Sequence, residues 1–212
     1  MELINEFINE LFSGFASGDP KFIVSQIAAL ITAVLAVFCV QVNNPRHILY
    51  LQLAVNLTTI ASHLFNGAGS GTAVVIVAVI HLACNCAFSL KGKTPPKFLL
   101  WLFAVPYIGS VIIGSERMMQ FRYTEFGFWV DGLLIFAAIC FMLAVSSKKA
   151  SGYRFFILIN TFLWIVYDFY GGVNPNVSML VTHIVLQVSN IIAIVRLDIL
   201  KKGEAKAATE ED

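Results

Sequence analysis

Seven long apolar stretches, separated by short polar segments, fill almost the whole chain. Each is close to the roughly 20 residues that an α-helix needs to cross about 30 Å of hydrocarbon. The pattern predicts seven transmembrane helices, at Phe22–Val42, Ile48–Gly67, Thr72–Leu90, Phe98–Ile113, Phe128–Val145, Tyr153–Tyr170 and Val177–Leu197. Of the 212 residues, 58% are hydrophobic and 13% charged, which leaves no room for a soluble domain. We therefore expect an all-α membrane protein.

The segment before the first span has a different pattern. Its apolar residues recur at helical spacing, with three glutamates on the other face: Leu3, Ile4, Phe7, Ile8, Leu11, Phe12 and Phe15 against Glu2, Glu6 and Glu10. This predicts an amphipathic interfacial helix over residues 1–18. Asp19 is expected to cap the first span and Pro20 to begin it. The charged, Ala-rich tail, 201–212, is expected to be disordered and cytoplasmic.

The basic residues are distributed unevenly between the two ends of the predicted helices. With the N-terminus outside, three basic residues face outward: Lys21, Arg117 and Arg122. The other eleven face inward: Arg46, Lys91, Lys93, Lys97, Lys148, Lys149, Arg154, Arg196, Lys201, Lys202 and Lys206. The positive-inside rule then predicts an outer N-terminus and a cytoplasmic C-terminus. A net charge of +1 gives no reason to expect a nucleic-acid partner.

The second and third spans resemble the sixth and seventh in layout. A shift of 104 residues aligns Asn56 with Asn160 and Phe65 with Phe169. Two tandem three-helix units would point in opposite directions unless one extra span lay between them, and the short fourth span fits that place. We therefore predict a 3+1+3 plan of parallel triple-helix bundles. Its parts are a first bundle at 19–97, a linker helix and outer loop at 98–127, and a second bundle at 128–200.

The plan, orientation and helix lengths resemble those of the superfamily of SWEET, PQ-loop and Pnu vitamin transporters. More closely, the segment 164–172 (WIVYDFYGG), with Asn190-Ile191-Ile192 and Arg196, is similar to the YgjV-like bacterial inner-membrane proteins. The superfamily resemblance implies a transporter or facilitator in the bacterial inner membrane, whereas the YgjV-like resemblance implies no particular cargo. The Pro-Gln pair of PQ-loop proteins is absent, and the only mid-span proline is Pro106 in the linker.

Polar residues form stripes on four of the spans. They have a period of three to four residues, which places each set on one helical face. Because polar groups in hydrocarbon need partners or water, we expect these stripes to meet between the two bundles and bind a small polar solute. The candidate substrate-binding residues are Asn56, Thr59, His63, His81, Asn85, Asn160, Trp164, Asp168, His183, Gln187 and Asn190.

Other interpretations stay open. Amide, hydroxyl and imidazole groups in a membrane also bond neighbouring helices, and we expect that structural role for Gln52, Thr58, Ser62, Thr182 and Ser189. Asp168 lies either in the binding path or in the headgroup region. Asp131 is expected at the interface, and the four cysteines are expected to pack as small apolar groups.

Function can be narrowed to three classes. A transporter of a small polar solute is the leading hypothesis, with uniport and proton coupling both open. A non-transporting sensor or assembly protein is the alternative, and a metal or haem protein is a weaker one. The expected partners are a small polar solute, the lipid bilayer and further copies of the chain in a homo-oligomer. The sequence has no paired mid-depth carboxylates, no HExxH motif and no Ser/His/Asp pattern, so we expect neither an enzyme nor a bound cofactor or metal.

Overall fold

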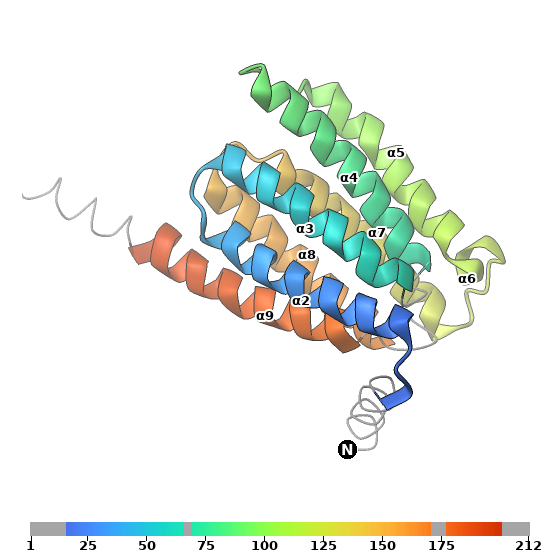
Figure 1. The fold of residues 1–212 in the computed structure, drawn as a ribbon. Coiled ribbons are helices and arrows are strands. Elements are labelled where there is room, and N and C mark those ends of the chain that lie inside the picture. The colour runs from blue at the N-terminus through green and yellow to red at the C-terminus, as the bar shows by residue number, and fades with distance from the viewer. Residues whose placement is uncertain (1–15, 66–68, 171–176, 201–212) are drawn as a thin grey trace, which may run out of the picture.

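The computed structural model describes residues 16–65, 69–170 and 177–200, and these residues form a bundle of helices without a strand (Figure 1). The helices are α2 (Pro20–Gln41), α3 (Pro45–Phe65), α4 (Gly69–Leu90), α5 (Lys97–Gly114), α6 (Glu116–Met119), α7 (Phe126–Val145), α8 (Ala150–Tyr170) and α9 (Val177–Ala193), which continues as the π-helical segment η1 (Ile194–Leu200). Seven of these helices are long and apolar enough to cross a membrane. The predicted number of spans is thus confirmed within the described part of the chain.

The helix ends follow from local sequence. The Asp19 side chain accepts a hydrogen bond of 3.0 Å from the backbone N–H of Lys21, and Pro20 is the first helical residue, as predicted. Helix α4 ends at Leu90. Two residues later, Gly92 adopts a φ of +65°, a left-handed conformation that favours glycine. The predicted interfacial helix, except for its last three residues, and the predicted tail lie outside the described residues.

Six helices form a closed ring. In order around it, α2 contacts α3, α3 contacts α4, α4 contacts α7, α7 contacts α8, α8 contacts α9, and α9 returns to α2. Helix α5 packs on the outside of this ring against α4 and α7 (Figure 1). Its outward residues Trp101, Val105 and Ile113 are each more than 70% exposed, so this face meets lipid in a membrane.

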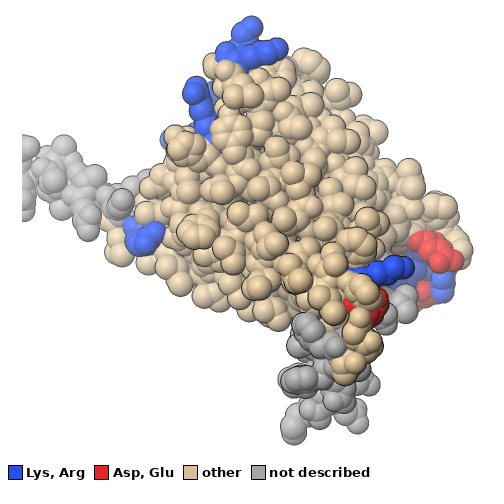
Figure 2. Space-filling model, viewed as in Figure 1, with Lys and Arg blue, Asp and Glu red and all other residues tan. Residues whose placement is uncertain are grey.

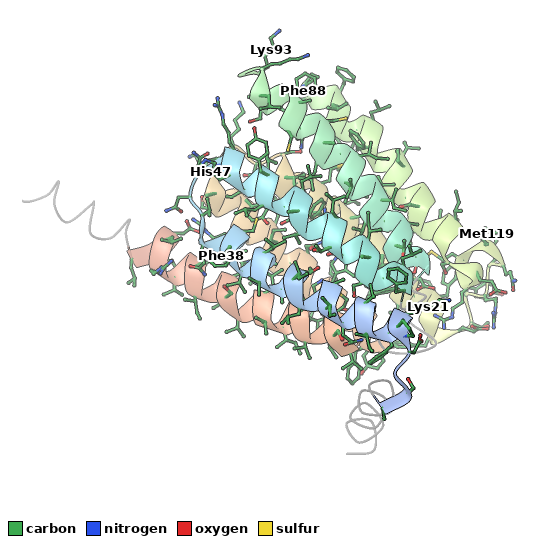
Figure 3. The ribbon with its side chains drawn as sticks, in the orientation of Figure 1. Lys21, Phe38, His47, Phe88, Lys93 and Met119 are labelled. Atoms are coloured by element: carbon green, nitrogen blue, oxygen red, sulfur yellow. The ribbon has the colours of Figure 1, made fainter. Side chains whose placement is uncertain are left out.

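The two ends of the bundle differ in charge. Figure 2 shows Lys and Arg side chains at the ends of the helices, with an uncharged belt between them. One end holds α6, and Met119 and Lys21 lie toward it in Figure 3. The opposite end holds Lys93, and we name it the basic end, because the described basic residues there are Arg46, Lys91, Lys93, Lys97, Lys148, Lys149, Arg154 and Arg196.

Candidate functional site

A small enclosed cavity lies at the centre of the ring. Its volume is about 60 Å³, and since one water molecule needs roughly 10–15 Å³ of such space, it has room for a few waters. All six ring helices contribute to its lining, and α5 contributes one residue. The polar and aromatic lining residues are Thr32, Gln52, Asn56, Thr59, His63, Tyr107, Phe141, Asn160, Trp164, Thr182 and His183.

Two buried asparagines, Asn56 on α3 and Asn160 on α8, both line this cavity. The Nδ2 group of Asn160 donates a hydrogen bond of 2.8 Å to the carbonyl oxygen of Ala137 on α7. The Oδ1 atom of Asn56 accepts one of 3.3 Å from Gln52, but its Nδ2 group has no acceptor among the described residues. A buried amide without a partner is costly unless water or a solute meets it. Asn56 therefore presents a donor at the wall of the cavity.

Aromatic rings form the wall of the cavity nearer the α6 end. The indole of Trp164 stacks with the imidazoles of His63 and His183, at centroid distances of 5.5 and 5.6 Å. Trp164 was predicted to bind substrate, and in this structure two protein imidazoles stack on its indole. The polar ring atoms of both histidines thereby lie beside a large apolar surface, which fixes their orientation.

Asp168 lies beside this aromatic group and is buried rather than interfacial. Its side chain is fully enclosed, and its Oδ2 atom is 2.6 Å from Nδ1 of His183. Its Oδ1 atom has no partner among the described residues. The carboxylate does not line the cavity itself, so it acts on the cavity through His183. Asp131, expected at the membrane interface, is buried within the protein, where Ser115 donates to its Oδ2 atom at 2.6 Å and Arg117 lies 3.7 Å away.

His81 and Asn85 do not reach the central cavity. They line a larger vestibule of about 500 Å³ at the basic end, where α4 and α5 diverge from α3 (Figure 1). Both side chains are 1% exposed. His81 stacks on Phe103 of α5 at a centroid distance of 4.4 Å, so the stripe on α4 is turned toward α5 rather than toward the centre of the ring.

A thin polar partition separates the vestibule from the cavity. Tyr107 lines the cavity, and its hydroxyl lies 3.4 Å from Nδ1 of His81. The Nε2 atom of His81 lies 3.4 Å from Nδ2 of Asn85, which lines the vestibule. These three side chains therefore join the linings of the two spaces through two polar contacts.

Two predicted site residues have other surroundings. Asn190 is fully buried and donates a hydrogen bond of 2.8 Å to the carbonyl oxygen of Arg154, so it joins α9 to α8. Gln187 is half-buried and does not line the central cavity. The structure therefore does not bring these two residues together with Asn56 and Asn160.

Most of the residues expected to be structural do bond neighbouring helices. The hydroxyl of Ser25 donates a hydrogen bond to the carbonyl oxygen of Ser62, and the hydroxyl of Thr32 donates to that of Thr58. The side-chain amide of Gln41 donates to the hydroxyl of Ser189, and the hydroxyl of Thr182 donates to the carbonyl oxygen of Ala29. Gln52 bonds another helix as well, because its Oε1 atom accepts a hydrogen bond from Tyr153 on α8, and both Gln52 and Thr182 also line the cavity.

Two residues with important contacts, Tyr107 and Arg154, were not predicted from the sequence. Tyr107 belongs to the linker helix, which has no polar stripe, and its neighbour Pro106 was the only signal there. Arg154 was counted as a loop charge but is 1% exposed. Its guanidinium binds both carboxylate oxygens of Asp198, at 2.9 and 2.8 Å, and donates to the carbonyls of Val40 and Val42. It thereby ties α8 to the ends of α2 and α9 at the basic end.

Side chains that could bind a metal ion do not cluster in the described part of the chain. Among the described residues, no group of three or more His, Cys, Asp or Glu side chains is placed to hold a metal ion. The four cysteines are free thiols, with Cys39 and Cys86 buried.

Comparison with known proteins gives the family. No curated protein and no solved structure matches the chain significantly. A family model described as Imp-YgjV, bacterial inner membrane protein, matches residues 23–201, which cover the seven apolar helices except for the first three residues of α2. The chain therefore belongs to the Imp-YgjV family and is a multi-pass protein of the bacterial inner membrane.

Proposed function

We propose that this protein carries a small polar solute across the inner membrane by alternating access. In this proposal, α2–α4 and α7–α9 are two parallel three-helix bundles related by an axis along the membrane normal, and α5 is the linker. The basic end faces the cytoplasm, in agreement with the positive-inside rule. The solute passes between the bundles by way of the central cavity.

The order of helix contacts supports the repeat. Within the first bundle α3 lies between α2 and α4, and within the second α8 lies between α7 and α9. The bundles meet at two places, α4 with α7 and α9 with α2, and a two-fold axis would exchange these two junctions. The residues aligned by the shift of 104, Asn56 and Asn160, lie on the middle helix of each bundle and both line the cavity.

The observation that carries the proposal is a cavity at the junction of both bundles whose lining includes polar side chains from each bundle, such as Asn56 and Asn160. A bundle held together only by structural bonds has no need of a cavity to which every ring helix contributes. At about 60 Å³ the cavity is far smaller than the roughly 300–1,000 Å³ of small-molecule sites. We infer that the structure represents a state in which the central site is closed and the vestibule is open at the basic end.

The small size of the cavity also favours the second candidate, a sensor or assembly protein that moves no solute. The two candidates differ in the effect expected from substitutions in the cavity lining. A carrier must widen the cavity during its cycle, so residues that line it affect flux, whereas in a static protein they affect only folding.

A pair of asparagines provides the test. Asn160 and Asn190 are both buried, and each donates a 2.8 Å hydrogen bond to a carbonyl of a neighbouring helix, but only Asn160 lines the cavity. Each alanine variant should lose similar stability, of the order of 1 kcal/mol. In proteoliposomes screened for uptake of sugars, nucleosides, amines and organic anions, Asn160→Ala should reduce flux at least about tenfold more than Asn190→Ala. Absence of saturable uptake for every solute would favour the static protein, whereas equal losses of flux in both variants would show that the solute path does not depend on the cavity side chain of Asn160.

A further inference from the structure

The vestibule at the basic end has a lining that suits an anion. It lies between the first turn of α3, the last turns of α4 and α7, the α4–α5 loop and the first turn of α5. Its volume of about 500 Å³ lies in the range of small-molecule sites, roughly 300–1,000 Å³. Unlike the central cavity, it is large enough to admit a solute in the observed state.

Four basic side chains line this space, and no acidic one does: Arg46, Lys93, Lys97 and Lys148. None of the four forms an ion pair with a described residue. Arg154, in contrast, is at the same end but outside the lining, and its charge is neutralised by Asp198. The positive charge of the vestibule is thus not compensated by the described part of the protein. A concave surface lined by one sign of charge concentrates ions of the other sign.

Two helix N-termini add to this field. Helix α3 begins at Pro45 and α5 at Lys97, and both residues line the vestibule. At α3 the Oδ1 atom of Asn44 already accepts a hydrogen bond of 2.9 Å from the N–H of Arg46, so this terminus contributes mainly through its dipole. The first N–H groups of a helix and its dipole attract anions. At α5 the cap residue is Pro96, which forms no side-chain hydrogen bond to the first turn. The N–H groups at this terminus therefore lack the side-chain acceptor that usually occupies the position.

The deepest part of the vestibule is polar and buried. Asn85 is 1% exposed, and while its Nδ2 group lies 3.4 Å from the carbonyl oxygen of Val145, its Oδ1 atom has no partner among the described residues. The protonated oxygen or hydroxyl of a bound solute could donate to it. Beside Asn85, His81 begins the polar partition that leads through Tyr107 to the central cavity. A solute held here would lie next to the entrance of the proposed path.

We propose that the vestibule binds a phosphate group, and that the solute of this protein is a small organic phosphate taken up from the basic end. The four cations and two helix termini match the charge and the several oxygen acceptors of a phosphate. This inference rests on the proposed carrier function, but binding in the vestibule can be measured without transport. An anionic phospholipid headgroup offers the same chemistry, so the experiment must separate the two sources.

The experiment is titration calorimetry of the purified full-length protein in neutral detergent. Glycerol 3-phosphate serves as the soluble probe and dihexanoyl phosphatidylglycerol as the lipid probe. The test variant is Lys93→Gln with Lys148→Gln. The matched control is Lys91→Gln with Lys149→Gln, which changes the charge equally on neighbouring exposed residues that do not line the vestibule.

The soluble probe should bind the wild-type protein, and the test variant should weaken its binding at least about tenfold, whereas the control should stay within about twofold. Because all four lysines are exposed, the variants should fold, and unchanged thermal unfolding checks this. Equal weakening in both variants, or no binding of either probe, would overturn the proposal. Binding of the lipid probe alone would overturn the soluble solute and assign the vestibule to a headgroup. Saturable uptake of a neutral solute in proteoliposomes would then leave the carrier function standing.

Discussion

The Nδ1 atom of His183 on α9 lies 2.6 Å from the Oδ2 atom of Asp168 on α8, within the membrane-spanning part of the bundle. The same imidazole stacks on Trp164, which also belongs to α8. The carboxylate is fully enclosed, so an ionised Asp168 depends on this one partner among the described residues. His183 thereby connects the buried carboxylate to the wall of the central cavity.

This pair should be energetically coupled. Asp168→Asn and His183→Gln should each destabilise the protein, and the double variant should be less destabilised than the sum, because either single change leaves one buried partner unmatched. We expect an interaction energy of about 1–2 kcal/mol from a double-mutant cycle, measured by unfolding in mixed micelles. An interaction energy indistinguishable from zero would mean that the two side chains do not depend on each other.

A close approach between α4 and α5 gives a second prediction. A Cβ atom placed on Gly114 would lie 2.6 Å from the Cα atom of Ser70 and 3.1 Å from the carbonyl oxygen of Gly69. These are backbone atoms, so the helices would have to separate. Gly114→Ala should therefore cost about 1–3 kcal/mol of unfolding free energy.

Gly109, in the same helix, is the matched control. A Cβ atom there meets nothing within 4 Å, so Gly109→Ala should be neutral or stabilise the protein by up to about 1 kcal/mol. Thermal unfolding of the two variants side by side measures the difference. A Gly114→Ala protein as stable as the wild type would show that α4 and α5 are not in contact at this point.

The seven helices could be predicted from sequence because hydrocarbon imposes length and apolarity on every span. The stripe on α3 and α8 likewise gave Asn56, Thr59, Asn160 and Trp164, which do line the cavity. A stripe defines one face of its own helix, but it does not say which neighbour that face will meet. His81 and Asn85 consequently face α5 and the vestibule, and Asn190 faces the backbone of α8.

Contributions from helices without a stripe could not be predicted. Tyr107 is an amphipathic residue on an otherwise apolar helix, and only the packing of α5 against α4 places its hydroxyl beside His81. The burial of Arg154 required knowing that Asp198, 44 residues later, returns to its side. Pairings between distant helices of this kind depend on the rotation of each helix, which hydropathy does not determine.

Arg154 should be among the most sensitive positions for stability. Arg154→Met removes the partner of Asp198 and the donor to two backbone carbonyls, so it should cost about 3–5 kcal/mol. Adding Asp198→Leu should recover part of this loss, because the unpaired carboxylate is then removed as well. Lys149→Gln, at an exposed lysine of the same end, should change stability by less than about 0.5 kcal/mol. If the double variant unfolds as easily as Arg154→Met alone, the ion pair is not the source of the loss.

The proposed orientation predicts which end of the bundle reagents reach from each side of the membrane. In a background lacking the four native cysteines, Ser89→Cys places a thiol in the vestibule, and Lys21→Cys places one near the α6 end. With the basic end in the cytoplasm, a membrane-impermeant thiol reagent should label Lys21→Cys in intact spheroplasts and Ser89→Cys only in inverted vesicles. Thr59→Cys, which lines the closed cavity, should stay unlabelled from both sides in the observed state. Labelling of Ser89→Cys in spheroplasts would reverse the orientation, and the vestibule would then open to the periplasm.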